Sequence, residues 1–234
     1  MSFIGVGVGP GDPELMTLKA CRVIREADII LLPSAPKEKC RAYQIIKGAL
    51  GDEIDDNKVI ECDFPMTMDA ASRDAYHNNV AELVCSLYKE GKTIVFPTIG
   101  DPTLYSTYTY LAERLIQKGI KCSIISGISS PFAAAAAINT DLALDREEVH
   151  IIPGQSDPAE AMKLKGTKIF MKNRSGLPKL LEAIKERKGE IEVYGVTDLG
   201  MTDEKKYYGI DEMSGDMGYL TTIIVKEGDE NTHV

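Results

Sequence analysis

The sequence predicts an α/β fold of two lobes, the first built on a largely parallel five-stranded sheet and the second on a mixed sheet. Three observations support this prediction. Apolar runs alternate regularly with amphipathic segments in the first part of the chain, the alternation is less regular from about residue 148, and a polar stretch at 139–148 separates the two patterns. Regular alternation of strands and helices is typical of a parallel sheet covered on both faces. We therefore expect domains at 1–143 and 144–234, with a ligand in the cleft between them.

The first lobe shows five strand-like runs separated by helical patterns. The expected strands are 3–8, 28–33, 58–63, 93–98 and 122–127, and the expected helices are 14–27, 41–50, 69–90 and 104–118. In the first helix, the spacing of Leu18, Cys21 and Ile24 predicts an inward apolar face.

The second lobe has fewer helical segments. Strands are expected at 149–154, 167–172, 190–197 and 219–226, and a helix at 176–188. Glycine-rich turns between these runs favour a mixed sheet.

Composition excludes several classes of function. The net charge of −9, from 27 basic and 36 acidic residues, argues against a nucleic-acid partner held by a basic surface. Five dispersed cysteines and three dispersed histidines predict neither a disulfide framework nor a metal site. The start of the chain lacks a basic leader, and no apolar run approaches membrane-spanning length, so we expect a cytoplasmic protein without a membrane partner.

A glycine-rich turn, FIGVGVGPGD (3–12), follows the first predicted strand and resembles the loops that bind a dinucleotide pyrophosphate. That fingerprint requires G-x-G-x-x-G and an acidic residue at the end of the second strand. Here the glycines alternate, Pro10 or Asp12 stands where the third glycine belongs, and Asp28 begins the second strand. The pattern argues against NAD. It leaves either a different ligand or a tight turn in which Asp12 or Thr17 caps the next helix.

Two further loops follow the fourth and fifth predicted strands. The segment 96–111 (FPTIGDPTLYSTYTYL) places Asp101 after a strand, and 126–138 (SGISSPFAAAAAI) places serines before an alanine-rich helix. Open α/β sheets bind ligands at the carboxyl ends of their strands. Taken singly, the Gly-Asp-Pro segment is better explained by helix capping, since Asp followed by Pro is a common helix start, and capping is an alternative for the serine loop too.

In combination the three loops are far more specific. GVGPGDPELMTLKA, TIGDPTLYSTYTYL and SGISSPFAAAA, in this order and spacing, resemble the tetrapyrrole (corrin/porphyrin) methylases, S-adenosylmethionine-dependent enzymes with two α/β domains. KIFMKNR and YLTTIIVK resemble the family's second domain, so the likeness spans nearly the whole chain. GDPTLYST and the MK pair are most similar to methyltransferases acting on carbon 20 of precorrin-2 or cobalt-factor II in cobalamin biosynthesis. One departure is Ser126, where many relatives have Pro.

The resemblance implies a set of residues around S-adenosylmethionine, which becomes S-adenosylhomocysteine on transfer. These cofactor-binding residues are Pro10, Ile99, Gly100, Asp101, Leu104, Ser129, Ser130, Met171, Lys172 and Gly200. Asp101 and Tyr105 are the residues that we expect to serve catalysis, Asp101 by pairing with the cofactor's positive charge or by orienting the ring. Methyl transfer from a sulfonium needs little acid–base help, so a site of backbone groups and small polar side chains suits it.

A tetrapyrrole carries many carboxylates, so an acidic chain must offer cations locally. Two loops after predicted strands supply them, and we expect Lys37, Lys39, Arg41 and Arg174 to bind the ring, with ordinary solvated charges as the alternative. Family members generally pair, so a homodimer is expected. The sequence leaves open a substrate methylated at another ring carbon, uroporphyrinogen, a catalytically idle tetrapyrrole-binding module, and whether the ring carries cobalt.

Overall fold

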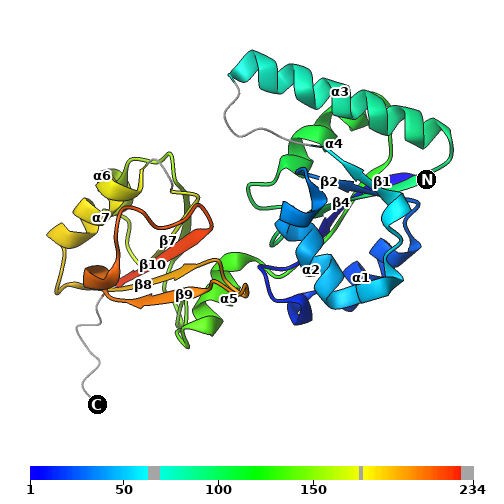
Figure 1. Cartoon of the computed structure of the whole chain (residues 1–234). Helices are drawn as coiled ribbons and strands as arrows, with labels where there is room; N and C mark the ends of the chain where they lie inside the picture. Colours follow the sequence, from blue (N-terminus) through cyan, green and yellow to red (C-terminus); the bar gives the residue numbers. More distant parts are fainter. Residues whose placement is uncertain (63–68, 174–175, 228–234) are drawn as a thin grey trace. The chain divides into compact units, whose positions relative to one another are not determined.

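The computed structural model describes residues 1–62, 69–173 and 176–227 of the chain. The chain forms two compact units, Met1–Ser129 and Ser130–Val234, each with its own sheet (Figure 1). The division falls earlier than the expected boundary at 143/144. It does so because helix α5 (Ser130–Ala137) contacts strand β10 (Thr221–Glu227) of the second sheet.

The first unit contains a five-stranded parallel sheet in the order β3-β2-β4-β1-β5. Its strands are β1 (Ser2–Gly7), β2 (Ile29–Leu32), β3 (Val59–Glu61), β4 (Thr93–Thr98) and β5 (Cys122–Ile125). The central strands are nearly continuous apolar runs, as expected where helices cover both faces. The predicted parallel sheet is confirmed, and its order makes β4, β1 and β5 neighbours.

Two pairs of helices cover this sheet, α1 and α2 on one face and α3 and α4 on the other (Figure 1). They are α1 (Leu18–Glu26), α2 (Arg41–Leu50), α3 (Ala70–Lys89) and α4 (Thr107–Gln117). Both candidate caps form. Asp12 accepts a hydrogen bond from the N–H of Glu14 at a 3₁₀ turn (Pro13–Leu15), and Thr17 accepts one from Ala20 at the start of α1.

The predicted inward face of the first helix is wrong at Leu18, which is 90% exposed. The 3₁₀ turn ends at Leu15, and α1 begins only at Leu18, so the helix does not continue the phase of the turn. Its buried residues are Ala20 and Ile24, one helical turn apart.

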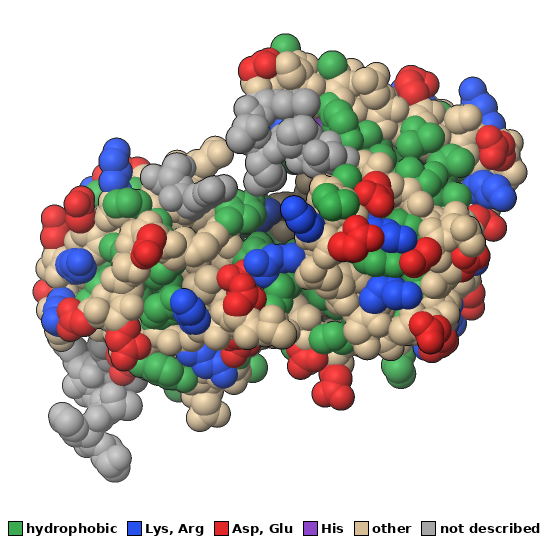
Figure 2. Space-filling view, viewed as in Figure 1, with side chains coloured by type: hydrophobic (Ala, Val, Ile, Leu, Met, Phe, Trp, Pro, Cys, Tyr) green, Lys and Arg blue, Asp and Glu red, His purple; other side chains and the backbone are tan. Residues whose placement is uncertain are grey.

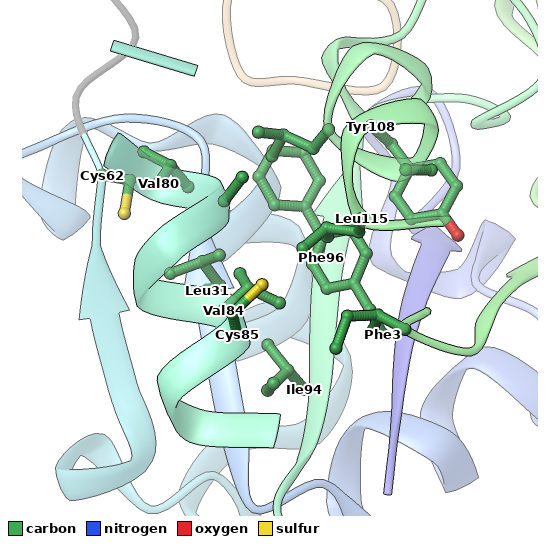
Figure 3. Packing of buried hydrophobic residues seen from close by; sticks show 14 residues of the cluster. Phe3, Leu31, Cys62, Val80, Val84, Cys85, Ile94, Phe96, Tyr108 and Leu115 are labelled. Atoms are coloured by element: carbon green, nitrogen blue, oxygen red, sulfur yellow. The ribbon is translucent and has the colours of Figure 1, made fainter. Parts of the chain in front are cut away.

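One hydrophobic cluster of the first unit lies between the sheet and helices α3 and α4 (Figure 3), and buried residues of α1 and α2, among them Ile24 and Ile46, pack on the other face. The rings of Phe3 and Tyr108 stack with 5.2 Å between their centroids, and the Tyr108 hydroxyl donates a hydrogen bond to the Ser123 carbonyl at 2.7 Å. A Cβ atom at Gly5 would lie 2.7 Å from the Tyr108 ring, so glycine is required there. Tyr108 therefore belongs to the core and ties α4 to strands β1 and β5.

The second unit contains a mixed five-stranded sheet in the order β6-β7-β10-β8-β9, in which only β6 and β7 pair in parallel among the described strands. Its other strands are β6 (Val149–Pro153), β7 (Thr167–Met171), β8 (Ile191–Thr197) and β9 (Lys205–Tyr208). Helices α6 (Pro158–Ala161) and α7 (Leu177–Glu186) pack on one face, around Phe170 and Ile223. The predicted mixed sheet is confirmed. Strand β9 and helix α6 were not predicted.

The surface shown in Figure 2 intersperses Lys and Arg side chains with Asp and Glu. In the described parts of the chain, no helix combines the length and apolar character needed to cross a membrane.

Candidate functional site

Three glycine-containing loops meet at the carboxyl ends of the neighbouring strands β1, β4 and β5. The N–H of Val8 donates to the Thr98 carbonyl at 2.9 Å, and the N–H of Gly100 donates to the Gly9 carbonyl at 2.7 Å. Beyond the parallel β1–β4 pairing, these bonds lead to an isolated antiparallel bridge between Gly9 and Gly100. The first two loops are therefore held together by their backbones.

The third loop joins them through contacts that only glycine permits. A Cβ atom at Gly127 would lie 2.2 Å from the Gly100 carbonyl oxygen, and one at Gly7 would lie 2.5 Å from the Gly127 nitrogen. Both distances are far shorter than any real Cβ contact, so the backbones of the three loops touch directly. The absence of side chains at these glycines therefore lets the three loops pack backbone against backbone.

Asp101 links two of these loops. Its Oδ2 accepts a hydrogen bond from the Gly127 N–H at 3.0 Å, and its Oδ1 accepts bonds from the N–H and hydroxyl of Thr103 at 2.8 and 2.5 Å. The Ser126 side chain donates a further hydrogen bond. Burial acts to raise the pKa of Asp101, but these donors outweigh it and hold the pKa below the ordinary 3.8. The side chain is therefore an ionised carboxylate at neutral pH.

The alternative interpretation of Asp101, as the cap of the following helix, is wrong. Helix α4 begins at Thr107 instead of the expected 104, and its cap is Ser106, whose hydroxyl accepts the Tyr108 N–H at 3.1 Å. Residues 101–105 form a turn that ends at Tyr105 with a left-handed φ of 51°. A non-glycine residue held in this conformation stores strain, which is common at functional sites.

The other expected residues of the first unit lie along the same loops. Pro10 is buried, Ile99 and Leu104 are half-buried, and Tyr105 is 39% exposed. Partial burial raises the pKa of Tyr105, so its phenol stays protonated at neutral pH. Ser129 ends the first unit and Ser130 begins α5.

In the second unit, Met171 and Lys172 lie where the parallel strands β6 and β7 end. Met171 is buried, and Lys172 has a left-handed φ of 57°. A Cβ atom at Gly154, after β6, would lie 2.2 Å from the Lys172 carbonyl oxygen, so these two strand ends are also in backbone contact. Gly200 follows β8, and its N–H donates to Glu204 at 2.6 Å.

The expected ring-binding cations differ in their surroundings. Lys37 donates to Asp56 at 3.1 Å and lies 5.8 Å from the centre of the Tyr43 ring, whose hydroxyl also donates to Asp56. Lys39 is exposed, and Arg41 begins helix α2. Arg174 lies outside the described residues.

Comparison with known proteins agrees with this geometry. Residues 2–210 match the family model of the Tetrapyrrole (Corrin/Porphyrin) Methylases. The chain belongs to this family. It is 38% identical over 226 residues to a probable cobalt-precorrin-2 C(20)-methyltransferase of Methanocaldococcus jannaschii, covering 95% of this chain and 94% of the relative. It is 28% identical to the cobalt-precorrin-2 C(20)-methyltransferase of Salmonella typhimurium, with the same coverage of both chains.

Solved structures of tetrapyrrole methylases share the fold. A cobalt precorrin-4 methyltransferase aligns with a TM-score of 0.75 at 20% identity, covering 96% of this chain and 94% of its own. Uroporphyrin-III C-methyltransferase of Thermus thermophilus, solved with S-adenosylhomocysteine, aligns with a TM-score of 0.72 at 16% identity, covering 97% and 98%. The predicted family, fold class and enzyme class are thereby confirmed.

Sequence reasoning missed three residues that hold the Asp101 carboxylate. Thr103, Ser126 and Gly127 supply the hydrogen bonds to Asp101. Ser126 stood out only as a departure from the family pattern, and its contact with Asp101 gives that departure a physical consequence.

Proposed function

We propose that this protein transfers a methyl group from S-adenosylmethionine to carbon 20 of precorrin-2 or cobalt-factor II in cobalamin biosynthesis. The observation that carries the proposal is the 38% identity to the Methanocaldococcus jannaschii relative across 95% of this chain. By contrast, the cobalt-precorrin-4 C(11)-methyltransferase of the same organism matches 59% of the chain, at 33% identity. The match over the whole length favours carbon 20.

The described residues fit S-adenosylmethionine as the methyl donor. The contact of Gly7, Gly100 and Gly127 brings the three loops together at the carboxyl ends of their strands, and Asp101 beside this contact is ionised. When bound, the cofactor supplies a methyl group on a positively charged sulfur that departs as a neutral thioether. A fixed carboxylate near this contact favours a sulfonium ligand over a neutral one.

In this proposal the protein holds the methyl donor and the ring in place and excludes water from the reacting atoms. Asp101 fixes the loop after β4 against the loop after β5, so that the peptide groups of both are placed before the ligand arrives. Tyr105, held in its strained turn with a protonated phenol, is the proposed hydrogen-bond donor to the ring. Pro10, Ile99 and Leu104 supply apolar contact around the donor. We assign Ser129, Ser130, Met171, Lys172 and Gly200 to the cofactor as well.

For the carboxylates of the ring we propose Lys39, Arg41 and Arg174, with Lys37 in support. Lys37 is already engaged by Asp56, and this contact fixes the segment that carries Lys39 and Arg41. Lys37 therefore contributes to ring binding mainly by holding Lys39 and Arg41 in place.

We further propose that the protein is a cytoplasmic homodimer. On the first unit, Tyr110 and Ile116 of helix α4 and Ile124 of strand β5 are exposed, with Tyr110 at 57% and Ile116 at 60%. Strand β5 is an edge of the described sheet, so a second copy could cover these apolar side chains. Light scattering of the purified protein tests this, and a monomer at working concentration would remove it.

The function is tested by incubating the protein with S-adenosylmethionine and one of three rings, namely cobalt-factor II, metal-free precorrin-2 or uroporphyrinogen III. Mass spectrometry should find a single added methyl group on one of the first two rings, and NMR of a carbon-13-labelled product should place it on carbon 20. A methyl group at another carbon, or on uroporphyrinogen, would reassign the substrate. Binding of the ring without transfer would indicate an idle binding module.

A further inference from the structure

The second unit contains a buried hydrogen-bond donor that the described structure leaves unused. Asn173 is only 6% exposed, and its side-chain nitrogen has no hydrogen-bond partner among the described residues. Native structures rarely leave a buried amide unpaired, because its N–H groups lose their hydrogen bonds to water. A bound ligand that supplies the hydrogen-bond acceptor would explain why this donor is buried without a partner.

Asn173 lies at the end of a strand, beside a second strand end. It follows strand β7 directly, at the carboxyl end of the parallel β6–β7 pair. A Cβ atom at Gly154 would lie 2.6 Å from the Asn173 Cα, so the chain after β6 passes directly against it. Lys172, the preceding residue, adopts a left-handed φ. The close packing of the two chain segments thus holds the backbone at Asn173, and the strained φ of Lys172 persists because of it, as expected for a site assembled before its ligand binds.

The chemistry around the amide indicates the type of acceptor. Met171 and Leu177, on either side in sequence, are 8% and 1% exposed, and burial lowers the pKa of the neighbouring Lys172 amino group. A neutral donor among apolar groups suits a neutral acceptor on a flat, largely apolar ring, because a carboxylate brought there would lose its hydration. The adenine of the proposed methyl donor has such acceptors in its ring nitrogens, whereas the periphery of the tetrapyrrole carries carboxylates.

We infer that the Asn173 side-chain amide donates a hydrogen bond to the adenine of the bound methyl donor. This inference rests on the proposed function, since it takes S-adenosylmethionine as the ligand. In the ligand-free protein the unpaired amide of Asn173 lowers the stability of the fold, and the amide gains its hydrogen bond when the ligand binds.

The test compares wild type with Asn173→Leu, which keeps a branched side chain of related shape and removes the donor. Melting temperatures are measured without ligand and with S-adenosylhomocysteine, and calorimetry gives the Kd. Thr167→Val is the matched control, because Thr167 is a buried polar residue at the opposite end of β7. We expect Asn173→Leu to melt no lower than wild type without ligand and its Kd to rise about five- to tenfold, as for one lost hydrogen bond. The control should bind as wild type does.

Wild-type affinity in Asn173→Leu overturns the inference, and so does a weakened Kd for cobalt-factor II with an unchanged Kd for S-adenosylhomocysteine. If Asn173→Leu melts lower or fails to fold, NMR of the wild type decides. The Asn173 side-chain amide, assigned through its own carbon resonances, should shift and exchange more slowly when S-adenosylhomocysteine is added, and unchanged signals overturn the inference. A wild type that binds no S-adenosylhomocysteine contradicts the proposed function itself, so the two failures are distinguishable.

Discussion

The carboxylate of Asp101 accepts a hydrogen bond from the backbone N–H of Gly127, with 3.0 Å between oxygen and nitrogen. This bond joins the loop after β4 to the loop after β5, across 26 positions of sequence. The other oxygen is occupied by Thr103 within its own loop. One side chain thus sets both the shape of the loop after β4 and its distance from the loop after β5.

The first prediction concerns Asp101→Asn. The amide retains an oxygen for Thr103 but turns an NH₂ group toward the Gly127 N–H, so that two donors face each other. Losing a charge-assisted hydrogen bond costs about 1.5–3 kcal/mol, which corresponds to a roughly 10- to 150-fold rise in the Kd for S-adenosylhomocysteine. Calorimetry measures this. Ser106→Ala, which removes the cap of α4, is the control and should lower stability by about 1 kcal/mol without changing the Kd.

The second prediction concerns pH. The pKa of Asp101 is lower in the folded protein than its ordinary value of 3.8, so its ionised form stabilises the fold at all pH values above 3.8. This contribution is lost as the pH falls through the folded pKa. The difference in unfolding free energy between wild type and Asp101→Asn should therefore be constant near neutrality and shrink below pH 3.8. Urea denaturation at a series of pH values checks this, and a difference that changes near neutrality would mean that Asp101 titrates there.

The meeting of the three loops was predictable from the sequence, because parallel strands place their carboxyl ends at one edge of a sheet. The partners of Asp101 were not. The Asp-Pro pair has the form of a helix start, but the turn that ends at Tyr105 moves the cap to Ser106. Contacts between Gly7, Gly100 and Gly127 join positions far apart in sequence, and no local pattern encodes such distances.

The second unit shows a similar limit. Strand β9, with the sequence KKYY, is a polar edge strand without apolar alternation, and α6 is a single turn, so neither gives a periodic signal. Asn173 lies between two cationic residues in the sequence, and nothing in that local pattern indicates a buried side chain. Its burial depends on the chain after β6 passing against it, a tertiary contact.

The third prediction tests the backbone contact. Gly127→Ala introduces a Cβ atom 2.2 Å from the Gly100 carbonyl oxygen, so the loops must separate. We expect the unfolding free energy to fall by about 1–3 kcal/mol and S-adenosylhomocysteine binding to be lost. Gly215→Ala is the control, because its Cβ atom would make only an ordinary 3.5 Å contact with Pro178. If Gly127→Ala binds as wild type does, the backbone contact is not part of the site.

The fourth prediction concerns a charge cluster in the second unit. Glu227 accepts hydrogen bonds from Arg187, at 2.8 Å, and from Lys168, whose side chain is completely buried. Burial acts to raise the pKa of Glu227, but both cations outweigh it and hold the pKa below 4.5. Glu227→Gln leaves the buried Lys168 without its counter-charge and should lower the unfolding free energy by about 3 kcal/mol. Glu160→Gln, in an exposed pair with Lys163, should cost less than about 0.5 kcal/mol.

The lowered pKa of Glu227 also predicts how the stability of the fold depends on pH. The stabilisation by Glu227 is complete above pH 4.5 and is lost as the pH falls through its folded pKa. Wild type and Glu227→Gln should therefore converge in stability in acid, as measured by urea denaturation. A difference that persists unchanged in acid would show that the charge of Glu227 is not what stabilises the fold.

The last prediction concerns the charge of the substrate. Lys39 and Arg41 follow β2 at the carboxyl edge of the first sheet, whereas Lys89 and Lys92 precede β4 at the opposite edge. Replacing Lys39 and Arg41 together by Gln should raise the KM for the ring about three- to tenfold, because exposed pairs are each worth about 1 kcal/mol or less. The affinity for S-adenosylhomocysteine should not change, and the double replacement of Lys89 and Lys92, which removes the same charge, should leave the KM unaltered.

Added salt should weaken ring binding more in wild type than in the Lys39 and Arg41 variant, because screening acts only on charges that are present. Equal salt sensitivity in both proteins would mean that these two cations are solvated surface and that other residues bind the carboxylates.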